Sequence, residues 1–75
     1  MNWCKFSSDY MYDQETGEYV KYPGLYCLDT GLSYVVAGND VLISNGGGYD
    51  VLQGKEKSDA VRKLFIYHGY QDGEV

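Results

Sequence analysis

The chain has 75 residues, of which 44% are hydrophobic and 23% are charged, and its formal net charge is -5. A chain of this length forms one small core and has no room for a second, so we expect a single domain over residues 1–75. The acidic balance repels phosphate groups and lipid headgroups. It argues against direct binding to nucleic acid or to an anionic membrane, and it favours a basic partner.

The net charge is unevenly distributed along the chain. Residues 1–54 contain seven acidic side chains and two lysines, whereas residues 55–75 contain four of each sign. We therefore expect the acidic part of the domain over 1–54, and the strand patterns described next make the same part β-rich. The chain begins without a basic stretch followed by an apolar run, and no apolar stretch is long enough to span a bilayer, so we expect a cytoplasmic protein in the host cell cytosol.

Short segments rich in Tyr, Val, Ile and Leu, separated by glycines and turn residues, predict β-strands in the first part of the chain. The loops between them are short enough to join antiparallel neighbours. The expected strands lie around Trp3–Tyr12, Glu18–Tyr22, Leu25–Leu28, Leu32–Ala37, Val41–Ser44 and Tyr49–Leu52.

Glycines predict where the chain turns. Gly17 and Gly31 each follow a threonine and an acidic residue, a pattern typical of a turn in which glycine adopts a positive φ. Pro23 and Gly24 fit the two central positions of a type II turn, which predicts a break between two strands. The run Gly46–Gly48 predicts a flexible or bulged connection after the last long strand.

The hydrophobic period changes after Lys57. Val61, Leu64, Phe65 and His68 recur at helical spacing, which predicts an amphipathic helix over 57–69 followed by a tail over 70–75. Ser58 is a candidate N-cap and Gly69 a candidate left-handed residue after the helix. An alternative interpretation takes Leu64, Ile66 and His68 as one face of a strand, but it leaves both end signals unexplained.

Together these patterns predict an α+β fold, with an antiparallel β-sheet of about four to six short strands in hairpins or a meander. One C-terminal amphipathic helix packs on one face of that sheet. Because a single short helix covers only one face, tyrosines and acidic residues of the other face remain in water or contact a partner.

The sequence offers few residues for catalysis or metal binding. Cys4, Cys27 and His68 lack the spacing of a zinc site, and we expect both cysteines to be reduced and buried. Lys55 follows a glycine-rich stretch, but the spacing and the following Glu56 do not match a phosphate-binding loop. An enzyme would need Cys27, His68 and Asp29 to meet as a nucleophilic arrangement. We expect no catalysis, no metal and no cofactor.

One segment, residues 9–19, combines four acidic residues and three tyrosines with no basic residue. Acidic and aromatic side chains together suit docking onto an Arg/Lys-rich groove that normally holds a nucleic-acid backbone. The alternative is a solvated hairpin whose tyrosines pair across strands. The expected partner-binding residues are Asp9, Tyr10, Tyr12, Asp13, Glu15, Glu18 and Tyr19.

These observations predict a non-catalytic, protein-binding module. In size, acidity and lack of a catalytic motif the chain is similar to small phage or mobile-element inhibitors, including anti-CRISPR proteins, which implies an inhibitor that occludes a basic nucleic-acid-binding surface. The alternative function is an oligomeric small-molecule-binding protein. Its pocket would form between protomers from Gly46–Gly48 and nearby tyrosines.

Overall fold

The computed structural model describes residues 2–75, and for residues 8–13 it describes the backbone alone. Within this part of the chain there are five strands, one α-helix and one short 3-10 helix. They are β1 (Trp3–Asp13), β2 (Glu18–Cys27), β3 (Ser33–Ala37), β4 (Asp40–Ser44), β5 (Asp50–Val51), α1 (Lys55–Tyr67) and η1 (Asp72–Glu74).

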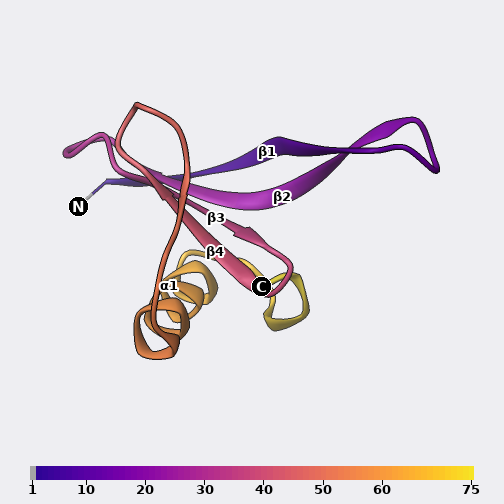
Figure 1. Cartoon of the computed structure of the whole chain (residues 1–75). Coiled ribbons are helices and arrows are strands. Elements are labelled where there is room, and N and C mark those ends of the chain that lie inside the picture. The colour runs from indigo at the N-terminus through magenta and orange to yellow at the C-terminus, as the bar shows by residue number, and fades with distance from the viewer. Residues whose placement is uncertain (1) are drawn as a thin grey trace.

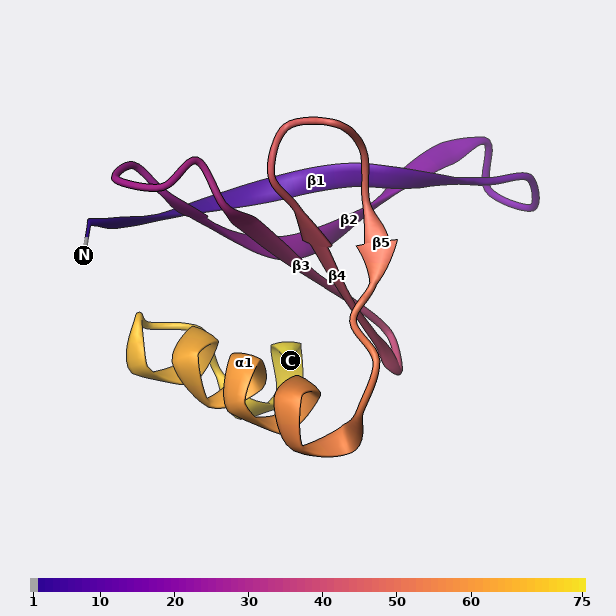
Figure 2. The same ribbon diagram turned by 60° about the vertical axis from the view of Figure 1, so that its left-hand side comes forward.

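The strands form one antiparallel meander in the order β1-β2-β3-β4-β5, and α1 lies against one face of it (Figure 1). The predicted α+β architecture is confirmed. Figure 2 shows that the C-terminal segment returns beside α1 on the same face of the sheet. No helix of the described residues lies on the opposite face of the sheet, which we call the open face.

The β1–β2 hairpin is much longer than the rest of the sheet. Its pairing runs from Trp3–Cys27 at one end to Asp13–Glu18 at the other, with a register shift between Asp9 and Met11. β3 pairs with β2 only over Gly24–Tyr26. The distal half of the hairpin, residues 7–23, therefore projects from the sheet as a two-stranded ribbon, which we call the arm (Figure 1).

The predicted turn at Pro23-Gly24 is wrong, because β2 runs through both residues as one strand. Pro23 pairs with Ser7, and β3 begins to pair with β2 only at the next residue, so the missing donor of proline is tolerated at the edge of the paired region. Glycine is required at position 24 because a larger side chain has no room there, and not because the chain turns. A Cβ atom there would lie 2.5 Å from Cζ of Phe6.

The two Thr-Gly turns are confirmed, with φ of 73° at Gly17 and 75° at Gly31. In the second turn the acidic residue has a different role from the one expected. Asp29 accepts a hydrogen bond from the backbone N–H of Asn2 at 3.0 Å, and it is Thr30 whose hydroxyl accepts the N–H of Leu32 at 3.3 Å. Asp29 therefore fastens the start of β1 to this turn.

Helix α1 spans Lys55–Tyr67, two residues earlier at each end than the predicted range 57–69. The prediction of Ser58 as N-cap is wrong: Gly54 holds that position, and the Ser58 N–H donates to the Gly54 carbonyl at 3.1 Å as the first helical bond. The helix starts early because Leu52 is anchored on the sheet, where its N–H donates to the Val41 carbonyl at 2.7 Å.

The prediction of Gly69 as the left-handed residue after α1 is confirmed, although the last helical residue is Tyr67. Gly69 has a φ of 104° and donates to the carbonyl of Ile66, while the N–H of Tyr70 donates to the carbonyl of Phe65, both at 3.1 Å. These two bonds form a Schellman motif. The hydrophobic contact that usually accompanies it is present as well, since the rings of Phe65 and Tyr70 stack with centroids 5.3 Å apart.

The core lies between α1 and the sheet face it covers, as the helical spacing of Val61 and Phe65 predicts. Both side chains are buried there, and Phe65 is fully inaccessible to solvent. Burying a side chain of this size contributes roughly 1.5–3 kcal/mol. The sheet supplies Leu25, Val36 and Val41, and the partly buried residues around them are Trp3, Tyr34, Leu52, Leu64, Tyr70 and Val75.

The predicted tail over 70–75 closes this core. Tyr70 and Val75 pack against it, and η1 lies between them. Arg62 of α1 donates hydrogen bonds to the main-chain oxygen of Val75 and, at 3.2 Å, to that of Gly38 in the turn between β3 and β4. The arginine therefore joins the helix, the C-terminal segment and the sheet.

Candidate protein-binding surface

The arm positions the acidic and aromatic segment away from the core. At its end the backbones of Tyr12 and Tyr19 are paired, and so are those of Asp13 and Glu18. Strand pairing therefore brings the two halves of the predicted binding segment together, which sequence distance alone did not guarantee. The turn between them, residues 14–17, is exposed at the far end of the molecule (Figure 1).

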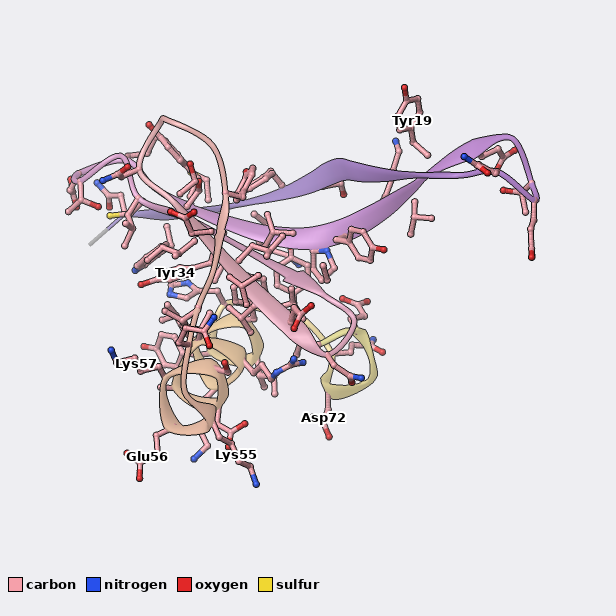
Figure 3. The ribbon with its side chains drawn as sticks, in the orientation of Figure 1. Tyr19, Tyr34, Lys55, Glu56, Lys57 and Asp72 are labelled. Atoms are coloured by element: carbon pink, nitrogen blue, oxygen red, sulfur yellow. The ribbon has the colours of Figure 1, made fainter. Side chains whose placement is uncertain are left out.

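Three of the predicted binding residues have described side chains. Glu15 and Glu18 are exposed, and 61% of the Tyr19 side chain is accessible to solvent. Figure 3 shows Tyr19 rising from the arm into solvent. The other four predicted residues, Asp9, Tyr10, Tyr12 and Asp13, have a described backbone in β1, but their side chains lie outside the described part of the structure.

The open face of the sheet contains a second candidate surface. Alternation along the strands directs Cys4, Phe6 and Tyr26 to this face, because their neighbours Trp3 and Leu25 pack against the core. A shallow hollow of 360 Å³ lies there. It is lined by Cys4, Phe6, Tyr26, Ser33 and Tyr49.

Within one chain, the glycine-rich connection and Tyr49 line two different hollows. Gly48 lines a separate, smaller hollow of 130 Å³ together with Ser44 and Asp50, whereas Tyr49 lines the hollow on the open face. Gly46 and Gly48 have φ values of 112° and 110°, and the glycine run lies in the connection between β4 and β5, as predicted. The hollow on the open face is the larger of these two.

The two cysteines differ from each other. Cys27 is buried as predicted, but Cys4 is exposed, because alternation along β1 turns it to the open face. The Thr30 hydroxyl hydrogen bond is the main cause that lowers the pKa of the Cys27 thiol. Burial acts in the opposite direction, and backbone N–H groups of Thr30 and Asp29 add to the lowering.

The residues of the alternative nucleophilic arrangement have separate partners. The Cys27 thiol is hydrogen-bonded to Thr30, and Asp29 accepts a hydrogen bond from the backbone of Asn2. The His68 ring lies against the Trp3 ring, with ring centroids 6.2 Å apart. In the described part of the chain, no hydrogen bond joins the Cys27 thiol to the His68 imidazole. His68 caps the C-terminal end of α1, the boundary position that its place on the apolar stripe indicates.

Lys55 and Glu56, which follow the glycine-rich stretch, stand at the start of α1 and point away from the sheet (Figure 3). Among residues 2–7 and 14–75, whose side chains the structure describes, no three His, Cys, Asp or Glu side chains are grouped so that they could hold a metal ion. Over residues 2–75, no helix is long and apolar enough to cross a membrane.

Sequence reasoning missed the contacts of Lys5. Its ammonium group lies 4.3 Å from the ring centroid of Tyr70 and donates to the carbonyl of Gly69 at 3.4 Å. The signal was the alternation of β1, which places Lys5 on the same face as Trp3. Lys5 therefore stabilises the C-terminal end of α1 and does not contribute to the open face.

Comparisons with known proteins give no relative from which a function could be transferred. No protein-family model, no curated protein and no solved structure matches the chain.

Proposed function

We propose that the protein is a non-catalytic, protein-binding module that docks the acidic end of its arm onto a basic surface of a partner protein. The observation that supports this function is the projection of the arm from the sheet, with Glu15, Glu18 and Tyr19 exposed near its end (Figures 1 and 3). A projecting ribbon reaches a groove that a flat sheet cannot enter.

The charge of the arm favours a partner rich in Arg and Lys. The segment 9–19 has four acidic residues and no basic one, so its field attracts a cationic surface and speeds encounter with it. Exposed tyrosine adds apolar contact area with a polar tip, as is common at protein interfaces. A groove that normally holds a nucleic-acid backbone has the required charge, so binding there would inhibit the partner.

Capture of partners from a host lysate tests this function. The protein is immobilised, incubated with lysate at low and at moderate salt, and the retained proteins are identified by mass spectrometry. We expect a basic nucleic-acid-binding protein that is released as the salt concentration rises, because screening weakens contacts between exposed charges.

Charge reversal then assigns the surface. The triple variant Asp13→Lys, Glu15→Lys, Glu18→Lys is expected to lose the partner. A control variant reverses three exposed acids away from the arm, Asp40→Lys, Glu56→Lys and Asp72→Lys, and therefore has the same net charge. Equal loss in both variants would show that net charge alone governs binding, and retention by the triple variant would rule out the arm as the binding surface.

A second candidate function is the binding of a small apolar ligand in the open-face hollow. Its volume of 360 Å³ and its lining by Phe6, Tyr26 and Tyr49 favour this function. Fluorescence of an anilinonaphthalene dye with the folded protein tests it. We expect dye binding that is lost in a Ser33→Trp variant, whose indole fills the hollow, and an unchanged dye signal in that variant would exclude the hollow as a ligand site.

A further inference from the structure

The two edges of the sheet differ in a way that bears on assembly. β5 ends the sheet at one side and has only two residues, whereas β1 ends it at the other side with eleven. Within the described residues, no strand pairs with the outer edge of β1. Long exposed strand edges recruit further strands, and proteins usually shorten or cover them.

The direction of the backbone groups along β1 follows from two hydrogen bonds and the register of β1 with β2. Cys27 donates its N–H to the carbonyl of Leu32 at 2.8 Å, so its backbone groups face β3, away from its partner Trp3. The carbonyl of Asn2 accepts the N–H of Leu28 at 2.9 Å and so faces β2. Because direction alternates along a strand, Trp3, Lys5 and Ser7 present their N–H and C=O groups to the outer edge.

We propose that a second copy of this chain pairs antiparallel with β1 along this edge, which joins two five-stranded sheets into one. A second copy fits because an antiparallel pair of identical strands is related by a two-fold axis and satisfies both edges with the same residues. Both helices then lie on one side of the joined sheet and both open faces on the other.

The stretch from Trp3 to Asp9, which ends where the register with β2 shifts, sets the alignment of the two copies. Its midpoint is Phe6. Centred there, the alignment pairs Lys5 with Ser7 of the second copy and uses all seven residues. An alignment centred on Lys5 instead places two ammonium groups opposite each other, which is unfavourable.

This alignment also suits the open face. The two Phe6 residues become a non-hydrogen-bonded cross-strand pair, the type in which side chains lie closest. Each Phe6 lines the open-face hollow of its own chain, so pairing makes the two hollows adjacent. Apolar surface that one chain leaves half-exposed is covered by the other.

The net charge of -5 on each copy is compatible with this arrangement. In an antiparallel pair the two arms point in opposite directions, and Glu15 lies nine residues from the axis at Phe6. At the rise of a β-strand this is about 30 Å from the axis. The two acidic arm ends are therefore far beyond the screening distance of about 10 Å.

Sedimentation of the full chain tests the proposal. We expect a mass twice the 8.5 kDa of one chain at protein concentrations up to about 1 mM. Ser7→Pro removes an outward N–H without removing a bond to β2, and we expect it to weaken the dimer at least about tenfold, since each 1.4 kcal/mol is a factor of ten. Ser7→Ala keeps the N–H and should sediment as the wild type does.

Disulfide trapping provides a measurement that does not depend on the folding of the proline variant. In the proposed alignment Cys4 lies opposite Ser8 of the second copy, at the Cα separation of about 4.5 Å typical of non-hydrogen-bonded pairs and within disulfide reach. Ser8→Cys should give a covalent dimer under oxidation, reversed by reductant. Ser7→Cys, on the other face of the strand, should not.

The results of these dimer experiments can be distinguished from those of the experiments that test the proposed function. Salt should leave this dimer intact or tighten it, because it screens repulsion between two acidic chains, whereas salt should release a basic partner from the arm. A wild-type mass of 8.5 kDa at every concentration overturns the proposal. A dimer that is not weakened by Ser7→Pro and not trapped as a disulfide by Ser8→Cys overturns it as well.

Discussion

The hydroxyl group of Tyr70 lies against the backbone of Gly24, from which it accepts the N–H at 3.2 Å while remaining 2.8 Å from the carbonyl oxygen of the same residue. The same hydroxyl is 3.0 Å from the carbonyl of Phe6 on β1. One side chain beyond the end of α1 therefore holds the base of the arm where it leaves the sheet.

Removal of this hydroxyl should destabilise the fold. Tyr70→Phe removes the hydrogen bonds of this hydroxyl to backbone groups of Gly24 and Phe6, which remain paired with each other across β1 and β2, and we expect the free energy of unfolding to fall by about 0.5–1.5 kcal/mol. Urea denaturation followed by tryptophan fluorescence measures it. Tyr67→Phe is the matched control, because Tyr67 is 83% exposed and its change should stay within about 0.5 kcal/mol. Equal stability of the two variants would show that the Tyr70 hydroxyl contributes nothing.

The contact between Gly24 and Phe6 predicts a substitution that can be rescued. Gly24→Ala brings a Cβ to 2.5 Å from the Phe6 ring, and we expect a loss of roughly 1–3 kcal/mol from overpacking. Adding Phe6→Leu should restore part of the lost free energy of unfolding. Thermal denaturation of the wild type, of Gly24→Ala and of the double variant measures both effects. Gly47→Ala, with no atom within 4 Å of the new Cβ, should be nearly neutral. Failure of the double variant to recover would place the strain elsewhere.

The two thiols should react at very different rates. Cys4 is exposed, whereas the exposed fraction of Cys27 is 0%. In the folded protein we expect one thiol to react rapidly with a chromogenic disulfide reagent, and both thiols to react in denaturant. Cys4→Ser should abolish the rapid phase. Rapid reaction of that variant in the folded state would mean that Cys27 is accessible.

The lowered pKa of Cys27 predicts how stability depends on pH. Because the Thr30 hydrogen bond lowers the pKa in the folded state, the unfolded chain binds more protons between the folded pKa and the ordinary value of the thiol. The free energy of unfolding should therefore rise as the pH increases through that interval, and fall as the pH decreases through the folded pKa.

Variants of Thr30 isolate this effect. Thr30→Val removes the hydroxyl and should raise the pKa of Cys27, which reduces the rise in stability, while Thr30→Ser keeps a hydroxyl and should preserve it. Urea denaturation at a series of pH values, with reductant present, measures the difference. Identical pH profiles for the valine and serine variants would contradict the assignment of the hydroxyl as the main cause.

Local signals predicted the glycine that terminates α1 but not the residue at which the helix begins. Gly69 terminates the helix because the left-handed backbone it adopts is a property of glycine itself, independent of the rest of the chain. Ser58 is a good N-cap in isolation, yet the helix starts before it. The anchoring of Leu52 on β4 leaves two residues for the connection, so tertiary contacts decide where the first turn forms.

The candidate binding surface was likewise predicted only in part. The sequence predicted the acidic and aromatic composition of residues 9–19, but it did not predict that Glu18 pairs with Asp13 at the end of a projecting arm. It also predicted a turn at Pro23 and Gly24, because the dipeptide has the backbone preferences of a type II turn. The aromatic ring of Phe6, from another strand, is what requires glycine at that position.

The sequence by itself determined the fold class, the helical face formed by Val61 and Phe65, and the acidity of the first 54 residues, since these depend on hydrophobic period and composition. Only the tertiary structure decided that β2 continues through Pro23, that Cys4 is exposed while Cys27 is buried, and that no strand of the described residues pairs with the outer edge of β1. The exposure of the two cysteines depends on register, because a one-residue shift in pairing would move each side chain to the other face of the sheet. The course of β2 and the free edge of β1 depend on which strands contact each other.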